Sequence, residues 1–437
     1  MIVSSREVRE GYKMTELGEI PSEWQVLNSE EIVVPEKSAI KIGPFGSQLK
    51  KESLTTEGYK VYGQENVFVN DFTLGNRFIN ENKYCQLKSC ELLPNDFVIT
   101  MMGTIGKCAI VPKDAEPGIM DSHLLRLRLD EKVYKNDLLL HVIKSDLVQQ
   151  QIKKLSVGGI MAGLSSKVIR QLKFPVPGLK EQQKIAEIFS TVDEQIENTE
   201  QLIEKTKELK KGLMQQLLTK GIGHTEFKQT ELGEIPTEWE VGKISEISSF
   251  CSNGFVGTAT PFYTEETDGI LYLQSNNIRK NKFDFNKTVY VNSDFTAKYT
   301  RAQVKTNDLL TVQSGHIGST AVVTTNYNGV YCHALIITRP IEDRIDSNFL
   351  AYYLNSSVGL KRLSNIFVGS TIKHINVKDF IKFVVPLPSL DEQQKIASIL
   401  SSVDEQIESY EQEKEKYLVL KKGLMQQLLT GKIRVTV

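Results

Sequence analysis

The chain carries an internal duplication on the scale of a whole domain. The heptapeptide Thr-Glu-Leu-Gly-Glu-Ile-Pro occurs at residues 15–21 and again at 230–236, and each copy leads to a tryptophan. The segment 181–219 recurs at 392–430, with 29 of 39 positions identical. This spacing far exceeds the ~20–50 residues of a solenoid repeat. We therefore predict two copies of one domain-sized unit rather than an array of small repeats.

The duplicated segments surround two long stretches that share little sequence. A constant frame around two variable inserts suits a protein that holds two different readers in a fixed geometry. At 437 residues the chain has room for about three domains, and each insert is long enough to bury its own core. The predicted parts are a conserved N-terminal segment at 1–26, a first insert at 27–173, a conserved long helix at 174–220, a linker repeating the N-terminal segment at 221–241, a second insert at 242–384 and a conserved C-terminal long helix at 385–437.

The composition argues against several classes of protein. No apolar run reaches the ~18 residues that a membrane span needs, and the charged N-terminus lacks the apolar core of a signal peptide. The five cysteines are scattered, odd in number and never in a Cys-x-x-Cys pair. We therefore expect neither a disulfide framework nor a cysteine zinc site, and the pattern favours a reducing cytoplasm.

The net charge of −1 hides an uneven distribution. The insert 27–173 has a formal charge of +3 and the insert 242–384 has +4, so the conserved frame is acidic. One interpretation is ordinary charge scatter. The other is that each insert presents a mildly basic face to phosphates.

Two long helices are predicted in the frame. Apolar residues recur at steps of three and four from Glu181 and from Glu392, without glycine or proline until Gly212 and Gly423. About 40 residues at ~1.5 Å each make a helix of roughly 60 Å, and the narrow apolar stripe indicates a coiled-coil seam. We expect the two copies to pair antiparallel about a pseudo-two-fold axis; the alternative is that each helix packs on its own insert. The stripe comprises Ile185, Ile188, Phe189, Val192, Ile196, Ile203, Leu209, Leu213 and Leu217, then Ile396, Ile399, Leu400, Val403, Ile407, Leu420, Leu424 and Leu428.

The inserts share a faint framework. Residues 95–111 read as Asn-Asp, an apolar strand, a Gly-Thr-Ile-Gly turn and a second strand, and 307–323 read the same way with Gly-His-Ile-Gly. We therefore predict one fold for both inserts, with binding specificity at the loop tips. Pro-x-Pro at 175–177 and 386–388 is interpreted as the hinge between insert and helix, because proline does not fit a helix interior.

No catalytic motif is found. Residues 103–108 resemble a phosphate loop only faintly, because they lack the four-residue gap between glycines and the final Ser or Thr. There is no Gly-x-Gly-x-x-Gly after a strand, no His-Glu-x-x-His, no Gly-x-Ser-x-Gly and no Asn/Asp-Pro-Pro-aromatic motif of an adenine methyltransferase. His316, His333 and His374 share one insert but lack metal-ligand spacing, so no metal site is expected.

Taken together, these motifs resemble the specificity subunits of type I restriction-modification systems. The resemblance rests on the Leu-Gly-Glu-Ile-Pro-x-x-Trp opening, the Gly-x-Ile-Gly turn, the Val-Pro-x-Pro-x-Leu-x-Glu-Gln-Gln-Lys-Ile-Ala helix start and the Lys-Lys-Gly-Leu-Met-Gln-Gln-Leu-Leu-Thr helix end, and it covers essentially the whole chain. It implies two similar target-recognition domains of mixed α/β fold, the two inserts, separated by a pair of long antiparallel coiled-coil helices. Each domain would read one half of a bipartite DNA site.

The resemblance also implies a division of labour. The chain would be non-catalytic and would hold no cofactor of its own. It would dock two adenine methyltransferase subunits that use S-adenosylmethionine and, in the full complex, two restriction subunits that use ATP and Mg. One departure, Lys220-Gly221 in the first copy against Gly431-Lys432 in the second, leaves the end of the first helix open.

The candidate DNA-binding residues lie in the inserts. Lysine and arginine are expected to hold phosphates and set the register, and polar loop side chains to read base edges in the major groove; solvated surface is the alternative for each. The candidates in the first insert are Ser47, Gln48, Lys50, Lys51, Gln64, Asn66, Thr104, Lys107, His123 and Arg126. Those in the second are Asn253, Gln274, Asn276, Arg279, Lys280, Gln313, Ser314, His316, Thr371, Lys373 and His374.

Three other classes of protein share some of these features. A fused restriction enzyme would need methylation and nuclease motifs, which are not found in the sequence. A coiled-coil structural protein would carry secretion signals and a longer coil, without a matched framework in its inserts. A DNA-binding regulator without a methyltransferase partner stays open on sequence alone.

Overall fold

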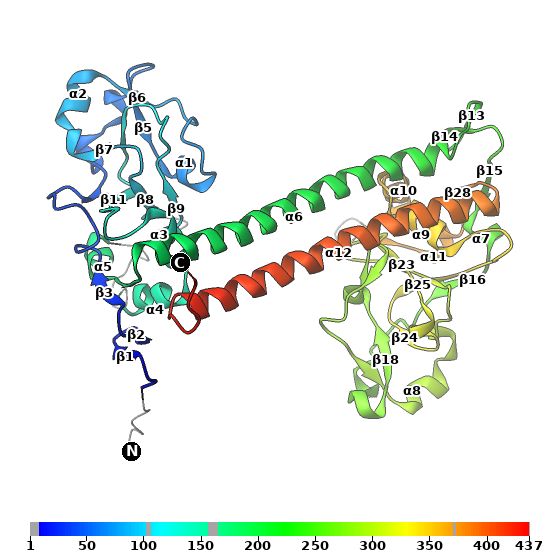
Figure 1. Ribbon diagram of the computed structural model, residues 1–437. Helices are drawn as coiled ribbons and strands as arrows, with labels where there is room; N and C mark the ends of the chain where they lie inside the picture. The colour runs from blue at the N-terminus through cyan, green and yellow to red at the C-terminus, as the bar shows by residue number, and fades with distance from the viewer. Residues whose placement is uncertain (1–7, 102–105, 156–164, 370–372, 437) are drawn as a thin grey trace. The chain divides into compact units, whose positions relative to one another are not determined.

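The computed structural model describes residues 8–101, 106–155, 165–369 and 373–436 (Figure 1). The chain forms two compact units. The first contains the residues up to Asn198 together with those from Glu413 on, and the second is Thr199–Gln412. The long helices α6 (Leu179–Lys220) and α12 (Leu390–Leu428) each contribute one part to each unit.

Two four-stranded sheets form the body of the first unit. The main sheet is antiparallel and the smaller one contains a parallel pair, β5 with β10. The main sheet has the order β4 (Ile40–Ile42), β11 (Leu124–Leu127), β8 (Phe97–Thr100), β9 (Cys108–Ile110); the smaller has the order β6 (Phe78–Ile79), β5 (Tyr59–Tyr62), β10 (Gly118–Met120), β7 (Glu91–Leu92). The short helices are α1 (Gln64–Phe68), α2 (Glu81–Gln86), α3 (Asn136–Val142), α4 (Asp146–Leu155) and α5 (Ser166–Gln171).

The main sheet of the first unit is buried on both faces. Phe97 and Ile99 of β8 pack with helices α3 to α5 and the first turns of α6, whereas Val98 between them faces the core around the smaller sheet. Alternate side chains of one strand point to opposite faces, so a continuous apolar run separates two cores. This arrangement leaves the strand ends and turns as the free edges of the domain.

The second unit repeats this plan, as the shared framework predicted. Leu309 packs with the helices and Leu310 with the opposite core. Its main sheet has the order β16 (Ser248–Asn253), β25 (Leu335–Pro340), β22 (Leu309–Val312), β23 (Thr320–Val322); the smaller has the order β17 (Tyr263–Thr264), β21 (Tyr290–Val291), β18 (Ile270–Leu273), β24 (Tyr331–Cys332). Two further hairpins are β19 (Ile278–Arg279) with β20 (Lys282–Phe283) and β26 (Phe367–Val368) with β27 (His374–Ile375), and the helices are α7 (Ile244–Ile247), α8 (Ser293–Lys298), α9 (Ser347–Asn355), α10 (Ser357–Leu363) and α11 (Val377–Phe380).

The long helices pair antiparallel within each unit. In the first unit Lys421 of α12 contacts Asp193 of α6, and in the second Lys207 of α6 lies 3.2 Å from Glu411 of α12. The apolar stripe faces the interior mainly near the helix ends. The beginning of each helix packs on the insert before it and its end on the other insert, so both sequence interpretations hold in part.

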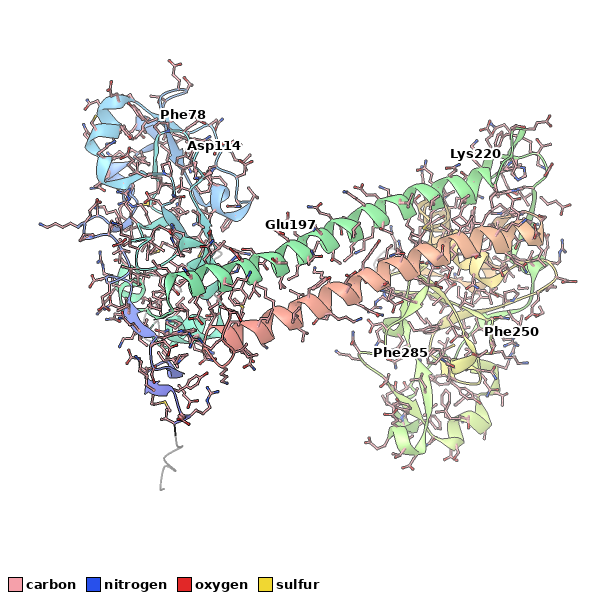
Figure 2. All side chains as sticks on the ribbon, in the orientation of Figure 1. Phe78, Asp114, Glu197, Lys220, Phe250 and Phe285 are labelled. Carbon is pink, nitrogen blue, oxygen red and sulfur yellow. The ribbon has the colours of Figure 1, made fainter. Side chains whose placement is uncertain are left out.

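Three stripe residues are exposed. Leu209 is 56% exposed and its copy Leu420 is 48% exposed, both in the last third of their helices, and Ile399 is 37% exposed. The prediction of a seam through these positions is therefore wrong. An apolar residue at helical spacing need not face the partner helix, because over many turns a 3.6-residue helix drifts out of a fixed repeat. Glu197 and Lys220, labelled in Figure 2, also lie on α6.

The duplicated heptapeptide folds as a hairpin in both units. Gly18 and Gly233 have φ 95° at the turns of β1 (Tyr12–Thr15) with β2 (Gly18–Pro21) and of β13 (Phe227–Thr230) with β14 (Gly233–Pro236). This left-handed conformation favours glycine. The hairpins set the buried Trp24 and Trp239 against the first turns of α6 and α12, where each indole nitrogen donates to a glutamate, at 3.0 Å in both units.

The Pro-x-Pro segments join a paired strand to the start of each long helix, and their role as hinges stays a prediction. Pro175 lies inside β12 (Lys173–Val176), which pairs with β3 (Gln25–Asn28), and Pro386 lies inside β28 (Val384–Leu387), which pairs with β15 (Glu240–Lys243). Proline is tolerated in these two-stranded sheets because its missing N–H can face outward.

The two long helices end differently, although their sequences are near-copies. α6 ends at Lys220 and Gly221 follows with φ 67°, whereas α12 ends at Leu428 and Gly431 has φ 65°.

Two further expectations can be compared with the described part of the chain. None of its helices is long and apolar enough to cross a membrane. The five cysteines, all of them described, are free thiols.

Candidate nucleic-acid interface

A buried ion pair lies at the start of the same strand in each domain, β8 in the first and β22 in the second. Asp308, which is fully buried, accepts from Arg339 at 2.8 Å and 2.7 Å, and Asp96 accepts from Arg128 at 2.8 Å and 2.9 Å. The asparagine before each aspartate has positive φ, a conformation that asparagine tolerates better than most residues. Because charge-assisted bidentate pairs are strong and directional, the strand that leads to each turn is held in one register.

In the second unit the turn that follows β22 brings several predicted DNA-binding residues together. Gln313 and Ser314 directly follow β22; the Gln313 carbonyl accepts from the backbone N–H of Ile375 at 3.1 Å, and Ser314 forms a β-bridge with His374. The Gln313 side chain donates to the amide oxygen of Asn253. Lys373, next to His374, is exposed. Residues from β16, β22 and β27 thus meet at one edge of the domain, although they lie up to 121 positions apart in the sequence.

The β19–β20 hairpin adds charge beside this turn. His316 shares a hydrogen bond of 2.8 Å with the carbonyl oxygen of Ile278, and Arg279 pairs with Asp284 at 2.9 Å. Lys280 is exposed and so is Lys282, which the sequence analysis missed. Lys280 lies in the turn between β19 and β20 and Lys282 is the first residue of β20, so the signal in the sequence was the group of cationic residues Arg279, Lys280 and Lys282.

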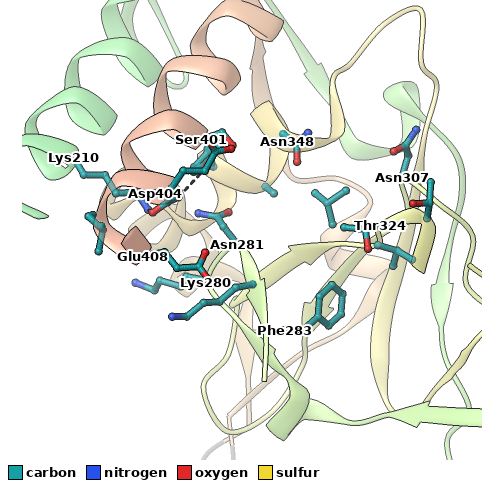
Figure 3. Close-up of a pocket in the computed structure, with 18 of the residues that line it drawn as sticks. Lys210, Lys280, Asn281, Phe283, Asn307, Thr324, Asn348, Ser401, Asp404 and Glu408 are labelled. Carbon is teal, nitrogen blue, oxygen red and sulfur yellow. Dashed lines mark hydrogen bonds and ion pairs between the residues drawn. The ribbon is translucent and has the colours of Figure 1, made fainter. Parts of the chain in front are cut away.

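A cavity of about 900 Å³ lies between this hairpin and the long helices of the second unit. Figure 3 shows Lys280 and Asn281 at its border, with Asp404 and Glu408 of α12 nearby. Lys207 and Lys210 of α6 also line it. The lining therefore carries charges of both signs and does not form a uniformly positive surface for phosphate.

Gln274 and Asn276 lie in the turn after β18. Gln274 donates to the Tyr263 hydroxyl at 3.0 Å, and Asn276 is exposed. Between them and Asp284 stands Asn277, which is buried; its side chain donates to the carbonyls of Asp284 at 2.9 Å and Lys287 at 2.7 Å. Asn277 therefore holds the loop together and leaves its neighbour Asn276 at the surface.

In the first unit most candidates are at the surface. Lys107 and His123 are exposed, and His123 Nδ1 lies 3.4 Å from Asp121. Gln64 at the start of α1 is half-buried. The remaining four are exposed in the loop that follows β4: Ser47, Gln48, Lys50 and Lys51.

Two candidates of the first insert are framework residues, which corrects the sequence interpretation. Asn66 is buried and donates to the carbonyls of Asp71 and Leu74, both at 3.0 Å, as its copy Asn277 does. Arg126 is 1% exposed and donates to the carbonyls of Ser38 and Glu91, and burial lowers its pKa. Buried polar groups that are already bonded cannot reach a base edge without losing those bonds.

His333 has a structural partner as well. Its Nδ1 shares a hydrogen bond of 3.0 Å with the Tyr272 hydroxyl, and burial lowers the pKa of the imidazole. Thr104 and Thr371 lie outside the described residues. Among the residues that are described, no group of His, Cys, Asp and Glu is placed to hold a metal ion.

Comparison with known proteins gives a consistent result. The family model described as the type I restriction modification DNA specificity domain matches this chain twice, at residues 22–208 and 226–417. The putative type I restriction enzyme MjaX specificity subunit of Methanocaldococcus jannaschii is 30% identical over 98% of this chain and 97% of its own. The type I restriction enzyme EcoBI specificity subunit of Escherichia coli is 24% identical over 78% of this chain and 73% of its own.

Solved structures share the fold. The type I restriction-modification system S subunit from M. genitalium superposes with a TM-score of 0.56 at 16% identity, over 93% of this chain and 96% of its own. A chain from a study of complex assembly and conformational transition of the type I R-M system also gives 0.56 at 16% identity, over 95% of this chain and 99% of its own. The twofold match of the family model, the full-length relative and the repeated frame agree, and the chain belongs to the type I restriction-modification DNA specificity family.

Proposed function

We propose that this chain is the non-catalytic recognition component of a type I restriction-modification complex, and that its two domains, within 27–173 and 242–384, each read one half of a bipartite site in double-stranded DNA. The observation that carries the proposal is the repeated frame. Asp96–Arg128 and Asp308–Arg339 hold the start of the same strand in both domains, while the sequences that follow β8 and β22 differ. Two different readers on one frame suit a site with two different halves.

The surface residues divide by chemistry. The exposed lysines, such as Lys50, Lys51 and Lys280, suit phosphate contacts that set register without reading sequence. The polar groups around the second domain's turn, Gln313 and Ser314 among them, suit base edges in the major groove.

Chemistry is assigned to partner subunits. Two methyltransferase subunits would bring S-adenosylmethionine, and two restriction subunits in the full complex would bring ATP and Mg, in the cytoplasm where the DNA lies. The support is the family membership and the lack of a catalytic motif in the sequence.

Methylation sequencing tests the proposal. The chain is expressed with its methyltransferase subunit in a host without modification systems, and methylated positions are mapped genome-wide. We expect one bipartite motif, of which only one half changes when 242–384 is replaced by the matching domain of a relative. The purified chain alone should transfer no methyl group. Sequence-specific DNA binding with no methylation in any pairing would favour a regulator, and no DNA binding would favour a structural protein.

A further inference from the structure

Two side-chain amides meet at the end of the second unit's main sheet. Asn253 is the last residue of β16 and Gln313 directly follows β22, and these strands lie on either side of β25. The Gln313 side-chain nitrogen Nε2 donates to Asn253 Oδ1. Both residues are partly exposed. The pair therefore lies at the surface, with one amide holding the other.

The fold does not need amides at these positions, because the first unit places apolar residues there. Asn253 stands opposite Ile336 as Ile42 stands opposite Leu125, and Met101 follows β8 as Gln313 follows β22. Met101 is 5% exposed within the core, and Ile42 packs against the same core. The same framework thus accepts either pair, so the amides are a property of this recognition domain rather than of the frame.

The orientation of the Gln313 amide limits what it can recognise. A planar amide offers a donor and an acceptor side by side, which matches the N7 acceptor and the N6 amino donor of adenine in the major groove. The bond to Asn253 uses one hydrogen of Nε2. Toward the residues that the structure describes, the second hydrogen and Oε1 make no further bond and stay available to a base. A residue fixed by a neighbour in this way loses less freedom on binding.

We propose that Gln313 reads one adenine in the half-site of the second recognition domain, and that Asn253 is the positioning residue that orients its amide. The proposal rests on the proposed function. Ser314 and Lys373 are exposed beside the Asn253–Gln313 pair, where Ser314 forms a β-bridge with His374. Both are placed to contact the DNA backbone next to the adenine.

The first test changes only the DNA. The wild-type chain, in complex with its methyltransferase subunit, is measured for binding to duplexes in which each adenine of that half-site is replaced in turn by 7-deazaadenine, which lacks the N7 acceptor. One position should weaken binding by about 5- to 150-fold, the discrimination of a good bidentate contact. Adenines of the other half-site serve as the control. Folding of the protein is not at issue, because the protein is unchanged.

The second test changes only the protein. The double variant Asn253→Ile, Gln313→Met reproduces the pair that the first unit already accommodates, and Gln229→Ala, an exposed glutamine of β13, is the matched control. Methylation sequencing should show one adenine of one half-site becoming degenerate in the double variant, with the other half unchanged. The 7-deazaadenine penalty at that position should vanish in the double variant and persist in the control. Asn253→Ile alone should reduce that penalty without removing it.

Distinct results separate the two levels of the proposal. A wild-type complex that methylates no defined motif would remove the proposed function itself. A defined motif whose adenines all tolerate 7-deazaadenine, or a double variant that keeps the motif intact, would overturn the assignment of Gln313 alone. A change at a G·C position would likewise overturn the adenine assignment.

Discussion

Lys210 of α6 donates a hydrogen bond to Asp404 of α12, and the Tyr352 hydroxyl of α9 donates to the same carboxylate at 2.9 Å. One carboxylate therefore ties both long helices to the recognition domain of the second unit. The same contact occurs in the first unit between Lys421 and Asp193, which lie 211 positions from Lys210 and Asp404. There the lysine comes from α12 and the aspartate from α6. The duplicated sequence thus specifies a duplicated attachment.

Removal of this joint should destabilise the second unit modestly. Lys210→Ala is expected to lower the free energy of unfolding by about 1 kcal/mol, because the Asp404 side chain is 35% exposed and water screens part of the interaction. Urea unfolding of the full chain measures it. Lys211→Ala, at the exposed neighbouring position, is the control. A double-mutant cycle with Asp404→Ala should show coupling; additive single effects would show that the contact contributes nothing.

His141 should make the first unit sensitive to acid. It occupies the position of Tyr352, is 3% exposed, and lies 3.4 Å from Asp193; burial lowers its pKa to about 4 despite this carboxylate. The unfolded chain binds the proton more readily, with a pKa of about 6.5. The neutral imidazole therefore contributes full stability above pH 6.5, and that stability falls as the pH drops from 6.5 to 4, by up to about 3 kcal/mol.

The variant His141→Tyr tests this window, because tyrosine is the residue that the second unit uses in the same joint. Chemical unfolding between pH 4 and 8 should show a shallower loss of stability in the variant than in the wild type. Tyr352→His, the reciprocal change, should add a pH dependence to the second unit. Identical pH profiles of wild type and His141→Tyr would contradict the prediction.

Arg434 should hold the end of α12 to the first unit. It donates to Glu181 at 2.6 Å and 2.9 Å, next to the buried Trp24, and Glu181 raises its pKa. The Glu181 side chain is only 5% exposed. Arg434→Ala would remove its cationic partner and leave only the hydrogen bond from the Trp24 indole. We expect a loss of about 2 kcal/mol, measured by thermal unfolding. Lys432→Ala, which removes an exposed charge two residues away, should have little effect.

The exposed lysines of the inserts should act on all DNA sequences alike. Lys50→Ala or Lys280→Ala is expected to weaken specific and non-specific duplexes by similar factors and to lower the slope of log K against log salt by about 1. Binding titrations at several salt concentrations measure this, and Lys395→Ala on α12, outside the inserts, is the control. Loss confined to the specific site, with an unchanged slope, would assign base reading or a structural role instead.

The sequence by itself determined the duplication, the two long helices and the strand-turn-strand framework, because repeats and apolar periodicity are properties of local sequence. It could not separate surface from interior among polar residues. Asn66 and Arg126 looked like readers, yet both are buried and bonded to carbonyls of distant segments. Leu209 looked like a seam residue and is exposed.

Tertiary structure decided which residues form a site. Asn253 and Gln313 are 60 positions apart, and only the placement of β16 and β22 beside β25 brings their amides together. The aligned pair in the first domain, Ile42 and Met101, has no polar group to reveal that these positions are neighbours. The pairing of strands and the burial of side chains depend on the packing of the whole unit, which no local pattern encodes.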